Sequence, residues 1–513
     1  MDNLYDVIIC GSGIGGLSAA AVLSNQGMSI LVIEKQNKIG GYAQSFSRKG
    51  FTFTPTLHHW GDMVVESYNK VLEYLNQQPI QYYRFSEKFS FPEHQLPARF
   101  NSDYRNNLLQ YFPEEAEQID NIFSVLEGIP LEIEKILTAQ INNTKLLLTP
   151  QKFPLIYKLR KATYVDLLQN IKNKQLRAIL LPVINCYNPD DLFISTATMH
   201  FHFQKYLHYY ADGGSDALVN RLADIIHIKK QSIITNTEVL KIKQSTDKVF
   251  TVETNNGYYK ARNIVINTDG PSSFLKILDD KLVNPQVREK INTSWKPTSS
   301  FFAVYLGLDY DIRNTVNCRE NIHHFESYGG IELSRNLAEG IIPDKIWSWV
   351  GFSPNLDRKN IPEGCSIVVA GLPMGYKPFQ NLVRKSAEYK QLKNIITELV
   401  IDIVEKYLPD VRKHIIVKES ATPLTYQRYS SNTNGAYHGW DKTFAYFNSS
   451  LKPGNEDKNI PGLYYVGGWY NIIGIINIAI HGVKVANSIL TKDNQTGIPI
   501  DTYLQEISET KIQ

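Results

Sequence analysis

The sequence predicts an α/β fold, in which a parallel sheet covered by helices is joined to a second domain. Three observations predict it. The chain has 513 residues, of which 43% are hydrophobic and 20% charged, enough for a large core and two or three domains. An apolar run near the N-terminus leads through a glycine-rich turn into a helix-compatible stretch. A second apolar run follows and ends in an acidic residue.

The first element is a short strand over residues 5–10. Its uninterrupted apolar residues are typical of a strand buried on both faces. The turn Gly11-Ser12-Gly13-Ile14-Gly15-Gly16 follows, and a helix is expected over residues 17–23. Gly11 permits the tight turn, Gly13 lets the backbone approach a pyrophosphate, and Gly16 lets the helix pack on the sheet.

The second strand, over residues 29–33, ends in Glu34. This acid stands roughly 20 residues beyond the glycines, where a carboxylate accepts hydrogen bonds from an adenosine ribose. The alternative is a glycine-rich turn in an unrelated α/β protein, but the order, the spacing and the acid all agree with a dinucleotide-binding fingerprint. The sequence therefore predicts a Rossmann-like nucleotide-binding domain.

A second glycine turn, over residues 35–43, comes directly after the acid. This arrangement resembles the flavoprotein family that contains phytoene desaturases, carotenoid isomerases, retinol saturases and flavin amine oxidases. Further matches lie at residues 210–215, 238–242, 263–267 and 460–468, so the resemblance covers nearly the whole chain. It implies FAD as the cofactor and a glutathione-reductase-type FAD-binding domain.

The resemblance also implies a set of cofactor-binding residues that are spread along the chain. They are Gly11, Ser12, Gly13, Gly15, Gly16, Glu34, Lys35, Gly40, Gly41, Tyr42, Ala43, Val239, Gly467, Gly468, Trp469, Gly474, Ile475 and Ile476. Trp469 stands where an acidic residue is common in the family. The chain has one complete dinucleotide fingerprint, so we expect no NADPH domain and an external electron donor or acceptor.

The family-like segments predict how the domains are arranged. Residues 1–75, 205–300 and 455–513 are expected to form the FAD-binding domain. Residues 76–204 and 301–454 then form a discontinuous α+β substrate-binding domain with a mixed sheet and covering helices. Within this second domain, apolar patterns predict strands over 301–308 and 366–372 and an amphipathic helix over 386–407.

Within the family, the branch that acts on polyene lipids resembles this chain most. Residues 56–61, which include His58 and His59, resemble a histidine-containing segment of retinol saturases, and residues 467–479 resemble their C-terminal segment. The resemblance implies an FAD-dependent oxidoreductase that saturates, isomerises or desaturates carbon–carbon double bonds of a long apolar polyene. His58 and His59 are the candidate catalytic residues, able to touch the flavin or deliver a proton; a structural hydrogen bond is an equal alternative.

Two other functions fit the same fold. A flavin amine or amino-acid oxidase would use an aromatic cage near the flavin, and Trp469 with Tyr470 offers one. A non-enzymatic prenyl-lipid chaperone, like those that bind prenylated GTPases, would need no flavin. The retained glycine turn and Glu34 disfavour the chaperone.

The remaining histidines give weaker signals. His323, His324 and Glu326 form a His-His-x-Glu pattern, but neighbouring residues of a strand point to opposite faces, so we expect no metal site. His200, His202 and His208 are interpreted as packing or surface residues.

Composition limits the partners and the compartment. The net charge of +3, from 54 basic and 51 acidic residues, gives no reason to expect nucleic acid as a partner. Four cysteines without close pairing predict a reducing, cytoplasmic setting. The N-terminus lacks the features of a secretory signal, and no apolar run is long enough to predict a membrane-spanning helix.

One segment, residues 145–177, is markedly basic. It holds eight basic residues and one acid, interleaved with leucine, isoleucine, phenylalanine and tyrosine. Such a segment fits a peripheral contact with an anionic membrane, which would give access to a lipid substrate. An ordinary solvated helix face is the alternative.

Overall fold

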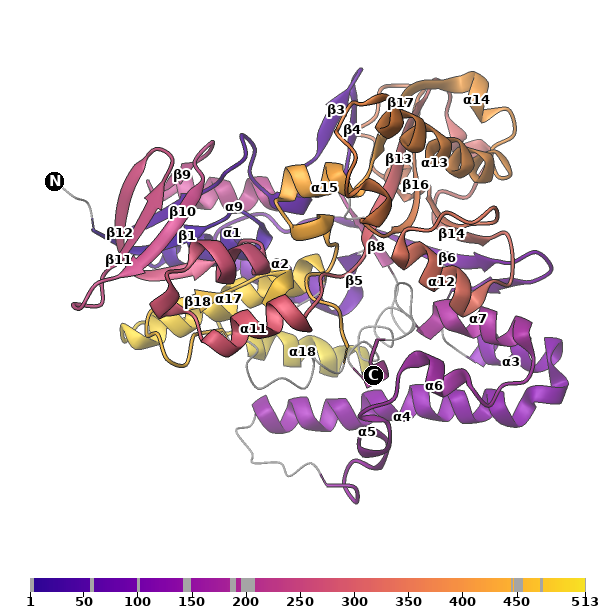
Figure 1. The fold of residues 1–513 in the computed structure, drawn as a ribbon, viewed down its shortest axis with the longest axis horizontal. Coiled ribbons are helices and arrows are strands. Elements are labelled where there is room, and N and C mark those ends of the chain that lie inside the picture. Colours follow the sequence, from indigo (N-terminus) through magenta and orange to yellow (C-terminus); the bar gives the residue numbers. More distant parts are fainter. Residues whose placement is uncertain are drawn as a thin grey trace.

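A computed structural model describes residues 4–55, 60–98, 102–141, 149–184, 191–194, 208–443, 446, 455–470 and 474–512. Two large sheets organise this part of the chain (Figure 1). The first sheet combines strands from the N-terminal, middle and C-terminal parts of the sequence, and the second combines strands from the segments between them.

The first sheet has the strand order β10-β11-β12-β1-β2-β9, and β18 pairs with β12. Its strands are β1 (Leu4–Cys10), β2 (Ile30–Ile33), β9 (Ser232–Ile234), β10 (Val239–Gln244), β11 (Phe250–Thr254), β12 (Gly257–Ile266) and β18 (Leu463–Tyr465). β1 pairs in parallel with β2 and with β12, so that Cys10, Ile33 and Ile266 lie side by side. The carboxyl ends of these strands therefore meet at one edge, where open α/β sheets bind their ligands.

Helices cover the first sheet. They are α1 (Ile14–Asn25), α2 (Asp62–Tyr74), α9 (Asp216–Ile228), α10 (Gly270–Ser272), α11 (Pro285–Thr293), α17 (Ile475–Lys492) and α18 (Ile500–Ile512). α1 is buried along nearly its whole length because it packs against both α9 and α17. A Cβ atom at Gly482 of α17 would lie 2.3 Å from the carbonyl oxygen of Gly15, so the two helices need a glycine at this crossing.

The second sheet has the order β17-β13-β16-β15-β14-β6-β8-β5, with β7 paired to β6. Its strands are β5 (Trp60–Gly61), β6 (Tyr82–Ser90), β7 (Gln95–Pro97), β8 (His208–Ala211), β13 (Ser300–Leu308), β14 (Glu320–Phe325), β15 (Trp347–Gly351), β16 (Ser366–Met374) and β17 (Ile415–Ala421). β14 and β6 run parallel, whereas β14 and β15 run antiparallel, so the sheet is mixed as predicted. A separate hairpin consists of β3 (Phe46–Arg48) and β4 (Phe51–Phe53).

Two groups of helices belong to this second part. α12 (Gly330–Glu339), α13 (Ala387–Glu405), α14 (Val411–His414) and α15 (Pro423–Ser430) accompany the sheet. α3 (Ser102–Tyr111), α4 (Ala116–Ile141), α5 (Pro154–Leu159), α6 (Tyr164–Leu168) and α7 (Lys174–Ile184) form a helical layer at the lower right of Figure 1. None of the helices described is both long enough and apolar enough to cross a lipid bilayer.

The strand and helix predictions agree with the structure. The strand predicted over 301–308 is β13, the strand over 366–372 is β16, and the helix over 386–407 is α13. The strands of the first sheet all come from the ranges assigned to the FAD-binding domain. β5 and β8 come from those ranges too, yet they pair with the second sheet, which they extend beyond β6.

Candidate functional site

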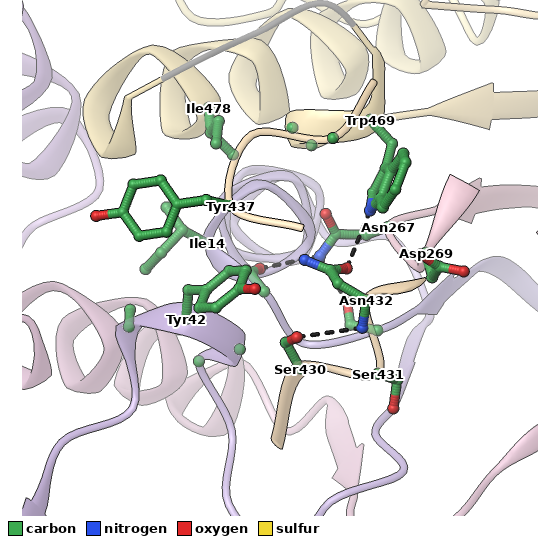
Figure 2. Close-up of a pocket in the computed structure, with 18 of the residues that line it drawn as sticks. Ile14, Tyr42, Asn267, Asp269, Ser430, Ser431, Asn432, Tyr437, Trp469 and Ile478 are labelled. Atoms are coloured by element: carbon green, nitrogen blue, oxygen red, sulfur yellow. Dashed lines mark hydrogen bonds between the residues drawn. The ribbon is translucent and has the colours of Figure 1, made fainter. Parts of the chain in front are cut away.

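A cavity of about 430 Å³ lies at the carboxyl edge of the first sheet and reaches the second sheet. From the first sheet it is lined by the turns after β1, β2, β12 and β18. From the second sheet it is lined by residues of β6, β8 and β14, and the segment 429–439 completes the wall. Figure 2 shows part of this lining.

The glycine turn after β1 has the geometry of an anion-binding loop. Gly11 has a φ of +99°, and a Cβ atom there would lie 2.6 Å from the carbonyl oxygen of Asn267. The side-chain amide of Asn267 donates to the carbonyls of Gly11, at 3.0 Å, and Gly13, at 3.2 Å. Because Gly13 is the N-cap of α1 and has no side chain to cap it, the first amides of α1 are left for a ligand.

Glu34 lies at the end of β2, is buried and lines the same cavity. Its Oε2 atom accepts from the main-chain amide of Ser12, at 2.9 Å, and from the Ser12 hydroxyl, at 2.5 Å. Its Oε1 atom accepts from the amide of Gln36 at 2.8 Å. The carboxylate is therefore held in one orientation beside the glycine turn.

The second glycine turn packs directly on the first. The amide of Gly40 donates to the carbonyl of Ser12 at 3.0 Å, and a Cβ atom at Gly41 would lie 3.3 Å from the Cα of Gly13. The next residue, Tyr42, directs its hydroxyl to the carbonyls of Gly435 and Ala436, at 3.1 and 2.9 Å. Burial raises the pKa of Tyr42 to about 12, so this hydroxyl keeps its proton.

The turn after β18 closes the cavity from the C-terminal side. Gly467 has a φ of +115°, and a Cβ atom there would lie 2.9 Å from Oδ1 of Asn267. The indole Nε1 of Trp469 donates to Oδ1 of Asn432 at 2.9 Å, as Figure 2 shows. This bond holds the Trp469 ring in the cavity wall.

The structure brings most of the predicted cofactor residues to this cavity. Those that line it are Gly11, Gly13, Glu34, Lys35, Gly40, Gly41, Tyr42, Ala43, Val239, Gly467, Gly468, Trp469, Gly474 and Ile475. Ser12, Gly15, Gly16 and Ile476 lie behind the wall. Of these, Ser12 orients Glu34, and Gly15 and Gly16 permit close packing against Val466 and Gly11.

The second sheet contributes a polar wall that the sequence reasoning missed. His208 of β8 and His323 of β14 are buried, the side chain of Glu87 of β6 is only 8% exposed, and all three residues line the cavity. His208, interpreted from the sequence as a packing or surface residue, therefore belongs to the site. His324 points to the opposite side of β14, where its Nδ1 lies 2.7 Å from the Tyr407 hydroxyl, so the expected alternation holds.

Other lining residues also went unassigned. Asn267 follows β12 at the sheet edge, a position that the parallel strand order would have flagged. Asp269 caps α10 through the amide of Ser272, at 2.9 Å, and accepts from the amide of Thr433, at 2.7 Å. His438 also lines the cavity, and burial lowers its pKa to about 3, which keeps the imidazole neutral. Among the described residues, no group of metal-ligating side chains is arranged to hold a metal ion.

The structure does not describe the two candidate catalytic histidines, and only one of the two predicted cage residues lines the cavity. His58 and His59 lie outside the described residues, between Pro55 and Trp60. Tyr470, proposed with Trp469 as half of an aromatic cage, packs instead against Phe274 and Tyr465 and does not line the cavity. Tyr42 and Tyr437, with ring centroids 6.1 Å apart, form an aromatic pair that lines it.

Comparison with known sequences gives one family and a consistent set of relatives. The family described as "Flavin containing amine oxidoreductase" matches residues 14–315. Prolycopene isomerase 2 from an Oncidium hybrid cultivar is 24% identical over 94% of this chain and 84% of its own length. All-trans-retinol 13,14-reductase from Homo sapiens is 22% identical over 95% of this chain and 86% of its own length.

Solved structures share the fold. Cyclohexylamine oxidase from Brevibacterium oxydans superposes with a TM-score of 0.63 at 14% identity, covering 96% of this chain and 100% of its own. Putrescine oxidase bound to putrescine gives a TM-score of 0.64 at 13% identity, covering 95% and 99%. The predicted fold class is confirmed.

Proposed function

Since the chain belongs to the flavin containing amine oxidoreductase family, whose match covers more than half of its length, we propose that it is an FAD-dependent oxidoreductase acting on carbon–carbon double bonds of a long apolar polyene. The family confirms the flavin cofactor expected from the sequence. The polyene and the reaction at its double bonds are the new part of the proposal.

The residues at the carboxyl edge of the first sheet fit FAD. A Cβ atom at Gly11 or Gly13 would collide with Asn267, so the turn needs glycine at both positions to keep its shape. The uncapped start of α1 offers its amides to the pyrophosphate. Glu34, already oriented by Ser12, would accept from the ribose hydroxyls. Gly41, Tyr42 and Gly467 would hold the flavin side. When bound, FAD supplies hydride transfer to or from carbon.

The polyene assignment rests on one observation. The relatives named for polyene substrates, a prolycopene isomerase and a retinol reductase, align over 94% and 95% of this chain, which includes both sheets. The cavity supports it, because beyond the cofactor residues it continues to the second sheet past Phe89 and Ala98. Such apolar walls exclude water and hold an extended hydrocarbon chain.

Anaerobic spectroscopy tests the proposal. Enzyme whose flavin has been chemically reduced should be reoxidised by a retinoid or carotenoid polyene, or should isomerise it without net oxidation. The flavin absorbance and the polyene spectrum report these outcomes separately. If no polyene changes either spectrum while an amine reduces the oxidised enzyme, the polyene assignment is wrong.

An amine substrate is the second candidate, and one observation favours it. Tyr42 and Tyr437 stand in the cavity wall with their rings tilted by 53°, and paired aromatic faces attract ammonium groups. The same anaerobic experiment, run with primary amines and with polyenes, separates the two candidates.

We also propose that the basic segment contacts anionic membranes. Lys158 and Arg160 are exposed at the end of α5, and the apolar side chains of Tyr157 and, on the neighbouring α4, Leu131 are 43% and 56% exposed. Exposed apolar and basic side chains together are typical of a surface that docks on anionic lipid. Lys145, at the start of the segment, lies outside the described residues.

A cytoplasmic setting and the domain limits remain part of the proposal. The described cysteines, Cys10, Cys318 and Cys365, are free thiols, which supports a reducing compartment. We retain residues 1–75, 205–300 and 455–513 as the FAD-binding domain, although β5 and β8 extend the other sheet. The electron donor or acceptor is external to the chain.

A further inference from the structure

Glu87, His208 and His323 form a polar cluster on one face of the second sheet. In the register of β6 and β14, Phe89 lies beside His323, so Glu87, two residues before Phe89, has its side chain on the same face. In the register of β6 and β8, Phe85 lies opposite His208, which places His208 on this face as well. All three side chains line the cavity, in a wall that also contains Phe89 and Ala98.

The Glu87 carboxylate is held from two sides. The indole Nε1 of Trp349 donates to Oε1 at 3.0 Å, and Nε2 of His323 lies 3.1 Å from Oε2. Nε2 of His208 is 3.7 Å from the same oxygen. The side chains of Glu87, His208 and His323 are 8%, 9% and 11% exposed, so these polar groups are largely removed from water.

The hydrogen bond between Glu87 and His323 determines whether the other ring nitrogen of His323 is a donor or an acceptor. A carboxylate only accepts, so Nε2 of His323 carries the proton, and in the neutral ring Nδ1 is then a bare acceptor. This Nδ1 atom is buried and has no hydrogen-bond partner among the described residues. Phe89, with its centroid 5.2 Å away, and Trp347, stacked at 13°, fix the ring plane.

A buried acceptor that has no partner in the protein is satisfied by a ligand that brings a donor. A hydroxyl group donates to Nδ1. A carbonyl or ester end group has no proton to donate, and a carboxylate end group would be repelled by Glu87. A plain hydrocarbon end would leave Nδ1 unpaired.

We propose that the Glu87–His323 pair recognises the hydroxyl end group of a polyene alcohol and rejects polyene carboxylates. This inference rests on the proposed function, because it assigns the end group of the polyene substrate. It makes His323 a specificity-determining residue and Glu87 the positioning residue that sets its tautomer.

Equilibrium binding to the purified flavin-loaded protein tests the inference without turnover. The probes are all-trans-retinol, its deoxy hydrocarbon analogue and all-trans-retinoic acid, with quenching of tryptophan fluorescence as the readout. Retinol should bind at least about tenfold more tightly than either of the other two, the size expected for one buried hydrogen bond. In His323→Phe, which keeps a flat ring, the affinity for retinol should fall to that of the hydrocarbon, whose own affinity stays unchanged.

Two variants sharpen the test. His324→Phe is the matched control, because its side chain lies on the other face of β14, and it should retain the preference for retinol. In Glu87→Gln, the side-chain amide would donate to Nε2 of His323 and move the ring proton to Nδ1. Because a hydroxyl also accepts a hydrogen bond, that variant should still bind retinol more tightly than the hydrocarbon, but it should gain affinity for retinoic acid and lose the preference for retinol over the acid.

The possible results separate the two proposals. If no probe binds, the polyene assignment itself fails. If all three probes bind equally to the parent protein, or if His323→Phe and His324→Phe behave alike, polyene binding stands and the Glu87–His323 inference is overturned. Melting temperatures of the variants, measured beside the parent, show that each one is folded.

Discussion

The carboxylate of Glu34 accepts hydrogen bonds from both the main-chain amide and the hydroxyl of Ser12, at 2.9 and 2.5 Å. The two residues lie 22 positions apart, at the ends of neighbouring parallel strands. Glu34 thus has two tasks, because the acid predicted to hold the ribose also fixes the glycine turn predicted to hold the phosphates. Removing it should disturb both contacts with FAD.

Glu34→Ala should weaken FAD binding by about tenfold to a hundredfold, corresponding to about 1.5–3 kcal/mol for the loss of hydrogen bonds to a charged group. Titration of the apoprotein with FAD, followed by flavin fluorescence, measures the change. Glu363→Ala removes an exposed acid and should leave the affinity unaltered. Equal affinities in the parent and Glu34→Ala would contradict the role assigned to the acid.

Alanine substitutions at two glycines distinguish the cost of backbone strain from the cost of a steric collision. Gly11, with φ of +99°, and Gly27, with φ of +83°, both adopt left-handed backbone conformations. A Cβ atom at Gly11 would lie 2.6 Å from a main-chain oxygen of Asn267, whereas at Gly27 nothing lies within 4 Å. Gly27→Ala should therefore cost only about 1–2 kcal/mol of backbone strain, and Gly11→Ala more, with loss of FAD. Thermal melting and flavin content measure both effects.

The first sheet and its turns were largely predictable because their signal is local. β1, the glycine turn, α1, β2 and Glu34 follow one another within residues 4–34, and each has its own sequence pattern. Asn267 was harder to assign. Its role comes from the pairing of β12 with β1, which brings its amide to Gly11 and Gly13 across more than 250 positions.

The polar wall of the second sheet could not have been read from the sequence. Glu87 and His323 are 236 positions apart. Glu87 stands in no recognisable motif, and the His-His-x-Glu pattern that contains His323 gives no indication of Glu87 as its partner. The parallel pairing of β6 with β14 brings them together, and a sequence does not state which strands of a mixed sheet are neighbours. His208 is buried and stacks on Phe85, as a packing residue would. Its position in the cavity wall beside Glu87 follows from the pairing of β8 with β6, which the sequence does not state.

Acid should destabilise the protein through its buried histidines. His481 on α17 is buried, and burial lowers its pKa to about 4, so the folded state resists a proton that the unfolded state takes up below about pH 6.5. Its stabilising contribution is complete above pH 6.5 and is lost as the pH falls toward 4, by about 1.4 kcal/mol for each pH unit. His481→Gln should flatten this decline in melting temperature.

The exposed His227 on α9 provides the control for that series, and His227→Gln should keep the parent slope. Burial also lowers the pKa of His438 to about 3 and that of His324 to about 4. Both histidines therefore make the protein less stable as the pH falls, so part of the decline in melting temperature persists in every variant. A His481→Gln slope identical to that of the parent between pH 7 and pH 5 would refute the assignment.

Membrane binding should depend on charge. Replacing Lys158, Arg160 and Lys161 together by glutamine should weaken sedimentation with anionic vesicles, because each basic residue near the surface contributes about 1 kcal/mol. Raising the salt concentration should weaken the binding of the parent protein to these vesicles in the same way. Glutamine at the exposed Lys229, Lys243 and Lys458, which lie elsewhere on the chain, removes the same charge and should change little. If the parent protein does not bind anionic vesicles at low salt, the proposed membrane contact is wrong.

His58 and His59, in the segment that follows the second glycine turn, are the candidate catalytic residues. His58 and His59 stand in the sequence just before Trp60, the first residue of β5, and β5 pairs with β8, which carries the cavity residue His208. If either imidazole handles the proton that accompanies hydride transfer, replacing both by alanine should slow the chemical step by about 10²-fold or more. FAD content and retinol affinity should stay near those of the parent. Single-turnover reoxidation of the reduced enzyme by a polyene measures this step, and an unchanged rate would assign both histidines a structural role.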